Sequence, residues 1–127
     1  MTVQIAHLYA LICLGIAFFQ VALIAGAPLG PWTQGGQNDG ALPASGRVIA
    51  AVSIAVVLFQ GLAIVSAAGF PGLGWPRWTG WVALGVSVLS LILTTLTPSA
   101  RERAVWAPIM LIQVGLAGYV MIVTAGG

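Results

Sequence analysis

Charged side chains are almost absent from this sequence of 127 residues, and this scarcity constrains the fold more than any other feature. The charged residues are Asp39, Arg47, Arg77, Arg101, Glu102 and Arg103. All of them fall outside four long apolar runs, a distribution that water-soluble domains do not show. Hydrophobic residues make up 60% of the chain, which suits a small bundle with a surface that faces lipid tails. The sequence therefore predicts an integral membrane protein.

Each apolar run is long enough to cross a bilayer as a helix, which takes about 20 residues at about 1.5 Å of rise each. The predicted spans cover approximately residues 3–25, 48–69, 79–96 and 104–124. No Lys or Arg precedes the first span, and its apolar stretch is longer than the core of a signal peptide, so we expect it to remain as a helix. We therefore predict an all-α membrane protein whose single domain, residues 1–127, is an antiparallel bundle of four transmembrane helices.

The positions of the arginines predict the orientation of this bundle. Arg47, Arg101 and Arg103 belong to the side of the loops after the first and third spans, whereas the opposite side has Arg77. Because positively charged loops tend to stay in the cytoplasm, we expect both termini to face outward, which in a bacterium is the periplasm. A net charge of +2 without any lysine is too small for a surface that binds nucleic acid, so no nucleic-acid partner is expected.

The predicted loop at residues 26–46 has more glycine and proline than a simple connection needs. A loop of this length in a small bundle is usually functional or disordered. Residues 28–32, which end in Trp32, are suited to fold back against the membrane interface with the indole as an anchor. We interpret Asp39, between Asn38 and Gly40, as a turn residue rather than a catalytic carboxylate.

Several loop motifs form a pattern that extends over most of the chain. They are GAPLG at 26–30, the double glycine at 35–36, Leu42-Pro43 ahead of Arg47, and PSARER at 98–103 followed by WAP at 106–108. This pattern resembles a group of small, uncharacterised four-helix bacterial inner-membrane proteins with a GAPxG-type glycine-rich first loop. The resemblance implies the four-span layout and a location in the bacterial inner (cytoplasmic) membrane, and it implies no activity.

Polar side chains within the predicted spans define the main candidate site. Gln20, Gln60 and Gln113 lie on three different spans, at depths that overlap those of Ser87 and Ser90 on the remaining span. An unpaired amide in hydrocarbon costs several kcal/mol, so we expect these groups to face inward and bond across helices. They serve either as polar contacts between helices, which need no ligand, or as the lining of a cavity that binds or passes a small molecule.

Small residues at Gly61 and Gly115 are expected where helix backbones approach closely. A second candidate site groups His7, Tyr9, Trp81 and Tyr119 at the outer interface. These side chains are suited to anchor the bundle at the interface, or to hydrogen-bond and stack against a quinone or a lipid headgroup.

The chain lacks the residues that most catalytic or metal sites require. His7 is the only histidine, and Cys13 is the only cysteine and is expected to act as a small buried hydrophobe. The two carboxylates, Asp39 and Glu102, fall in predicted loops. We therefore expect no catalytic residue, no metal site and no cofactor.

Three functional hypotheses follow from these features. The first is a non-catalytic accessory or scaffold subunit, with the lipid bilayer and a larger membrane complex or a homo-oligomer as partners. The second is a protein that binds or transports a small molecule or lipid through the polar stripe inside the bundle. The third is a redox subunit with a quinone site near His7.

Overall fold

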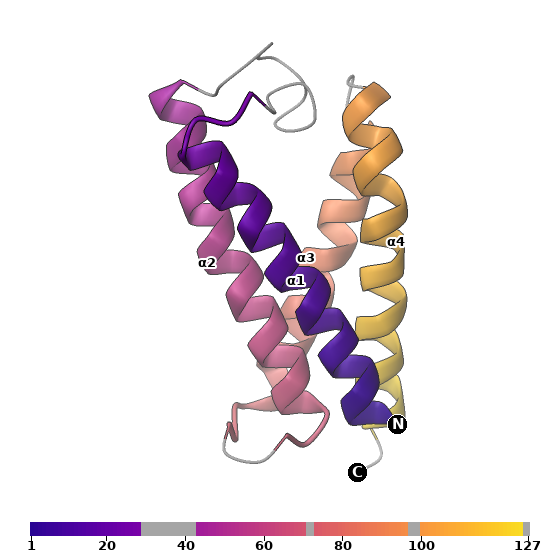
Figure 1. Ribbon diagram of the computed structural model, residues 1–127. Helices are drawn as coiled ribbons and strands as arrows, with labels where there is room; N and C mark the ends of the chain where they lie inside the picture. The colour runs from indigo at the N-terminus through magenta and orange to yellow at the C-terminus, as the bar shows by residue number, and fades with distance from the viewer. Residues whose placement is uncertain (29–42, 71–72, 97–99, 126–127) are drawn as a thin grey trace.

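Four helices follow one another along the chain in the computed structural model, which describes residues 1–28, 43–70, 73–96 and 100–125. They are α1 (Thr2–Ile24), α2 (Ala44–Ala67), α3 (Arg77–Leu96) and α4 (Ala100–Val123). Successive helices run in opposite directions, so the start of α1 and the end of α4 lie at the same end of the bundle (Figure 1). This arrangement confirms the predicted all-α fold of four helices. Residues 29–42, which include Trp32 and Asp39, lie outside the described residues.

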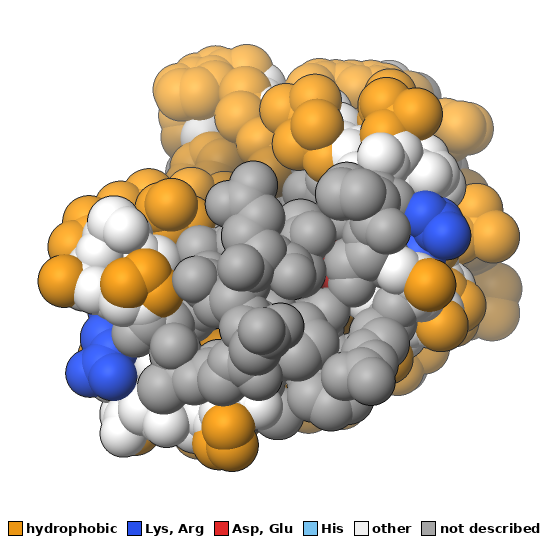
Figure 2. Space-filling model, turned by 90° about the horizontal axis from the view of Figure 1, so that it is seen from above, with side chains coloured by type: hydrophobic (Ala, Val, Ile, Leu, Met, Phe, Trp, Pro, Cys, Tyr) orange, Lys and Arg blue, Asp and Glu red, His pale blue; other side chains and the backbone are white. Residues whose placement is uncertain are grey.

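All four helices are long and apolar enough to cross a membrane, with candidate spans of 23, 24, 20 and 22 residues, and the chain is a multi-pass membrane protein. Large apolar side chains on every helix point outward, among them Phe18, Val52, Leu93 and Ile122. In the view along the bundle, hydrophobic side chains lie along much of its edge (Figure 2). An outer surface of this kind is suited to contact lipid tails.

The helices α2 and α4 begin earlier than the predicted spans, at Ala44 and Ala100 rather than near residues 48 and 104. Their first turns include Arg47 and Glu102, so the prediction that Glu102 lies in a loop is wrong. Hydropathy marks the part of a helix that lies in hydrocarbon, whereas the helix itself continues into the polar interface. A carboxylate in the first turn is also favourable, because it faces the positive end of the helix dipole.

Glycines end the first two helices with the same hydrogen-bond pattern. Gly26 has φ +99° and its amide donates to the Leu23 carbonyl, while the Ala27 amide donates to the Ala22 carbonyl. Gly69 has φ +94° and follows the same pattern at the end of α2. These are Schellman motifs, which use a left-handed glycine to satisfy the last carbonyl groups of a helix. The positive φ explains why glycine occupies both positions.

The four helices pack closely at the end of the bundle that holds the start of α1, which we call the terminal end. Gly80 of α3 lies so close to Met121 of α4 that a Cβ atom there would be 2.6 Å from the Met121 Sδ. The Arg77 Nη2 donates to the Met121 carbonyl oxygen at 2.7 Å, which satisfies a group near the end of α4. Gly61 of α2 lies against Ala10 of α1 less tightly, because a Cβ atom there would be 3.6 Å from the Ala10 Cα, an ordinary contact distance.

The two hairpins, α1–α2 and α3–α4, separate toward the opposite end of the bundle (Figure 1). We call it the arginine end, because the first turns of α2 and α4 lie there and contain Arg47, Arg101 and Arg103. Residues from all four helices form the main core, which includes Ala6, Ile64, Ala83 and Val120. At the arginine end, by contrast, a small core of Leu23 and Ala50 joins only α1 and α2. Within the described residues the bundle is therefore a wedge, with the hairpins close together at the terminal end and apart at the arginine end.

Candidate ligand cavity between the hairpins

A buried hydrogen-bond network joins three helices where the hairpins begin to separate. Tyr9 of α1 lies 2.6 Å from the Ser87 Oγ of α3, and the Gln60 Nε2 of α2 donates to both of them, at 3.2 and 3.1 Å. Ser87 also donates its proton to the Ala83 carbonyl oxygen at 3.0 Å, so the Tyr9 hydroxyl must be the donor in the bond to Ser87. Each of the two hydroxyl groups thus both donates and accepts. We call Tyr9, Gln60 and Ser87 the polar pin.

A second buried pair lies beside the polar pin and connects the remaining helix. The Gln113 Nε2 of α4 donates to the Cys13 Sγ of α1 at 3.2 Å. Cys13 is 1% exposed, so its sulfur acts as a buried acceptor as well as a small apolar group. The polar pin and this pair together tie both hairpins to each other near the middle of the bundle.

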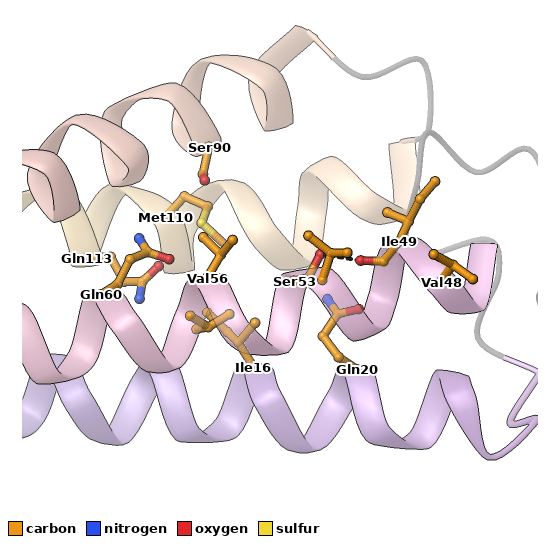
Figure 3. A pocket seen from close by; sticks show the side chains of 12 residues that line it. Ile16, Gln20, Val48, Ile49, Ser53, Val56, Gln60, Ser90, Met110 and Gln113 are labelled. Atoms are coloured by element: carbon orange, nitrogen blue, oxygen red, sulfur yellow. Dashed lines mark hydrogen bonds between the residues drawn. The ribbon is translucent and has the colours of Figure 1, made fainter. Parts of the chain in front are cut away.

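A cavity of about 380 Å³ lies between the hairpins on the arginine side of the polar pin. Its polar lining consists of Gln20, Ser53, Gln60, Ser90 and Gln113, and apolar residues such as Ile16 and Met110 make up the rest. The Gln60 and Gln113 side chains lie together at one end of the cavity, and Gln20 points toward Ser53 near the other (Figure 3). Small-molecule sites commonly have volumes of about 300–1,000 Å³ and a mostly apolar lining with a few polar groups.

Four of the five residues predicted for the ligand site therefore line one cavity. Ser87 is the fifth, and it belongs to the polar pin instead. Ser53 was missed by the sequence analysis, although it lies two helical turns before Gln60 and shares its face. Its hydroxyl donates to the Ile49 carbonyl oxygen at 2.9 Å, as serine hydroxyls in membrane helices commonly do.

Gln20 is the glutamine of the cavity that takes no part in the hydrogen-bond network. Its side chain makes no hydrogen bond to any of the residues that the structure describes, whereas Gln60 and Gln113 each use their amide nitrogen within the network. Gln20 is only partly buried, and no fully buried side-chain nitrogen or oxygen atom in the described residues lacks a hydrogen-bond partner, so the Gln20 amide is open to the cavity. The cavity therefore offers a hydrogen-bonding group that a bound molecule or water satisfies.

A smaller hollow of about 220 Å³ continues the cavity toward the start of α4. The two spaces share Ile16, Gln20, Ser90 and Met110 as lining residues. The continuation adds Thr94, Glu102 and Trp106. Because Glu102 lies in the first turn of α4 and not in a loop, it lines this outer continuation of the cavity. The continuation is therefore more polar than the inner cavity.

The residues predicted for a site at the outer interface are not brought together. Tyr9 is fully buried in the polar pin, His7 is exposed and forms an edge contact with Phe70 at a ring-centroid distance of 5.3 Å, and Trp81 is 46% exposed. No hydrogen bond or ring contact joins these side chains to each other or to Tyr119, all of which the structure describes. The helical position of Tyr9 turns it inward, where its hydroxyl finds partners that the interface does not offer.

The cavity lining offers amides and hydroxyls but no nucleophile paired with a base. Among residues 1–28, 43–70, 73–96 and 100–125, no three His, Cys, Asp or Glu side chains lie close enough to hold a metal ion. What the arrangement can do is accept and donate hydrogen bonds to a molecule held between the hairpins.

The fold and the cavity define the class of protein: a four-helix, multi-pass membrane protein with a polar cavity between two hairpins. No protein-family model, no curated protein and no solved structure matches the chain.

Proposed function

We propose that this protein is a non-enzymatic membrane protein that binds a small amphiphilic molecule in the cavity between its hairpins. The observation that carries the proposal is the amide of Gln20, which faces the cavity and has no hydrogen bond to the described part of the chain. The glutamines on three helices and the serines on two converge on the same space. Polar contacts between helices would explain Gln60 and Gln113, but they do not explain Gln20.

The proposed setting is the bacterial inner membrane with both termini in the periplasm. The resemblance of the loop motifs supports this membrane, and the excess of arginine at the arginine end supports the orientation. The cavity would then open toward the cytoplasmic side of the bilayer. In this setting the ligand reaches the cavity from the membrane itself or from the cytoplasmic interface.

The test is the recovery of a bound molecule from the purified protein. Native mass spectrometry after extraction in a mild detergent should show a bound small molecule or lipid, and Gln20→Leu should lose most of it. Gln4→Leu is the matched control, because Gln4 is an exposed glutamine on the same helix and does not line the cavity. A variant Gln20→Leu that retained the bound molecule as fully as Gln4→Leu would contradict the proposal. If no bound molecule were recovered at all, a scaffold role in a larger complex or homo-oligomer would replace it.

A further inference from the structure

A wall one side chain thick separates the cavity from the lipid-facing surface between α1 and α4. Phe19 of α1 and Trp106 of α4 form this wall, with their rings in edge-to-face contact at a centroid distance of 4.8 Å. Trp106 lines the inner hollow on one side and an outer groove on the other. This pair therefore lies where the two hairpins meet at the side of the wedge.

The outer groove is apolar throughout and has a volume of about 520 Å³. Its lining consists of Ile12, Gly15, Ile16 and Phe19 on one face of α1, and Trp106, Ile109 and Ile112 on α4. The groove is hollow at Gly15, because a Cβ atom built there meets nothing within 4 Å. A space of this chemistry between two membrane helices is suited to a hydrocarbon chain.

We propose that the ligand of the cavity, whose existence rests on the proposed function, is a single-chain lipid with an uncharged, hydrogen-bonding head. The head lies among Gln20, Gln60 and Gln113, and the chain passes between Phe19 and Trp106 into the groove between α1 and α4. Ile16 lines both the inner cavity and the outer groove, so the chain reaches the groove where the Phe19 and Trp106 rings move apart beside it.

The lining of the cavity determines the charge of the head. The cavity of about 380 Å³ is lined by amides and hydroxyls without any ionised side chain, so a charged head would be buried there without a counter-charge. An ester, alcohol or carbonyl group satisfies the amide of Gln20 without that cost.

Two other helix–helix interfaces give the chain no route out of the cavity. The seam between α1 and α2 is closed by the contact of Gly61 with Ala10 and by the small core of Leu23 and Ala50. A further groove of about 640 Å³ lies between α3 and α4, but it shares no lining residue with the cavity. The competing route passes Val52 of α2, which lines the cavity and is exposed.

Photo-crosslinking distinguishes these routes in the full chain reconstituted into lipid nanodiscs. Two monoacylglycerol probes are needed, one with a diazirine on the glycerol head and one with a diazirine near the end of the chain. We expect the head probe to label the cavity around Met110 and Gln113, and the chain probe to label the groove around Ile12 and Ile112. Labelling of Val52 by the chain probe, with the head probe still in the cavity, would overturn the proposed route alone. Absence of cavity labelling by the head probe would overturn the monoacylglycerol-like ligand, whereas the proposed function is decided by the recovery of a bound molecule in native mass spectrometry.

Filling the groove provides an independent test of the same inference. Gly15→Leu places a side chain in the groove, and Gly85→Leu on α3 is the matched control because neither glycine has an atom within 4 Å of its Cβ position. We expect Gly15→Leu to weaken binding of the monoacylglycerol at least about fivefold and Gly85→Leu to leave it unchanged. Oleate, which has the same kind of chain but an anionic head, should bind more weakly than the monoacylglycerol. Equal binding to Gly15→Leu and Gly85→Leu, or tighter binding of oleate, would overturn the inference.

Discussion

At the scale of single residues, the fold uses its few polar side chains in two different ways. Ser87 completes a closed set of hydrogen bonds, in which it accepts from Tyr9 and Gln60 and donates to the Ala83 carbonyl oxygen. Ser90, three residues later on the same helix, lines the cavity, and its hydroxyl makes no hydrogen bond to the described part of the chain. One serine is thus part of the packed interior, and the other remains available to a bound molecule.

This difference predicts opposite effects of two similar substitutions. Ser87→Ala leaves the Tyr9 hydroxyl and an amide N–H of Gln60 without a shared partner, so the free energy of unfolding should fall by about 1 kcal/mol or more. Ser90→Ala removes no hydrogen bond within the described residues and should change stability little. Unfolding of both variants in mixed micelles with increasing denaturing detergent measures the two values. Equal stability of both variants would show that the polar pin adds nothing to the fold.

At the scale of helices, contact between backbones depends on which face each glycine occupies. Gly80 is buried against Met121 and Ala67, and Gly61 is buried against Ala10 and Cys13. Gly115 was predicted to lie at a helix contact, and this is wrong within the chain: it is exposed, and a Cβ atom there would meet nothing within 4 Å. The sequence shows which helix positions lack a side chain, but it does not show whether those positions face another helix or the lipid.

Two substitutions on α3 test this description. Gly80→Ala places a Cβ atom 2.6 Å from the Met121 Sδ and 3.1 Å from the Ala67 Cβ, and it should destabilise the bundle by about 1 kcal/mol because the buried Met121 thioether must take another position and Ala67 must shift slightly. Gly85→Ala meets no neighbour and should stabilise α3 slightly, because alanine favours helix more than glycine does. Thermal unfolding of both variants in detergent, followed by circular dichroism, gives the comparison. A Gly80→Ala variant as stable as Gly85→Ala would show that the terminal end is less tightly packed than described.

At the scale of the whole molecule, the charged residues are separated along the bundle axis. Arg47, Arg101 and Arg103 belong to the first turns of α2 and α4 at the arginine end, and Arg77 is at the terminal end, where it binds the Met121 carbonyl. The hydrogen bond from Arg77 to Met121 helps to close the bundle. This structural role explains the position of Arg77 whichever way the protein is oriented in the membrane. The remaining arginines set the proposed orientation, with the terminal end outward.

Cysteine labelling in intact cells tests this orientation. In a Cys13→Ser background, whose hydroxyl retains an acceptor for Gln113, a cysteine at Ala125 should react with a membrane-impermeant maleimide and one at Ala100 should not. Both positions are exposed, at opposite ends of α4. Permeabilised cells, in which both cysteines should react, provide the control. Labelling at Ala100 but not at Ala125 in intact cells would reverse the orientation and leave the four-helix fold unchanged.

The sequence by itself determined the class of fold and the list of polar groups that the interior must accommodate. Helices that span a membrane are read from local hydropathy, because each must be apolar over its own length and must satisfy its own backbone hydrogen bonds. The same requirement predicted that Gln20, Gln60 and Gln113 turn inward, and all three line the cavity. The glycines at 26 and 69 likewise end their helices by local backbone geometry.

Only the tertiary structure decided how these groups are combined. In a membrane, apolar residues surround each helix, so the pattern along the chain does not show which face meets which neighbour. That choice depends on packing among all four helices, and it buries Tyr9, exposes Gly115 and places Gln20 in the cavity with no hydrogen bond to the described residues. The wedge shape arises for the same reason. Close contact at Gly80 and Gly61 holds the terminal end together, while at the arginine end the core joins only α1 and α2, and the space left between the hairpins is the cavity.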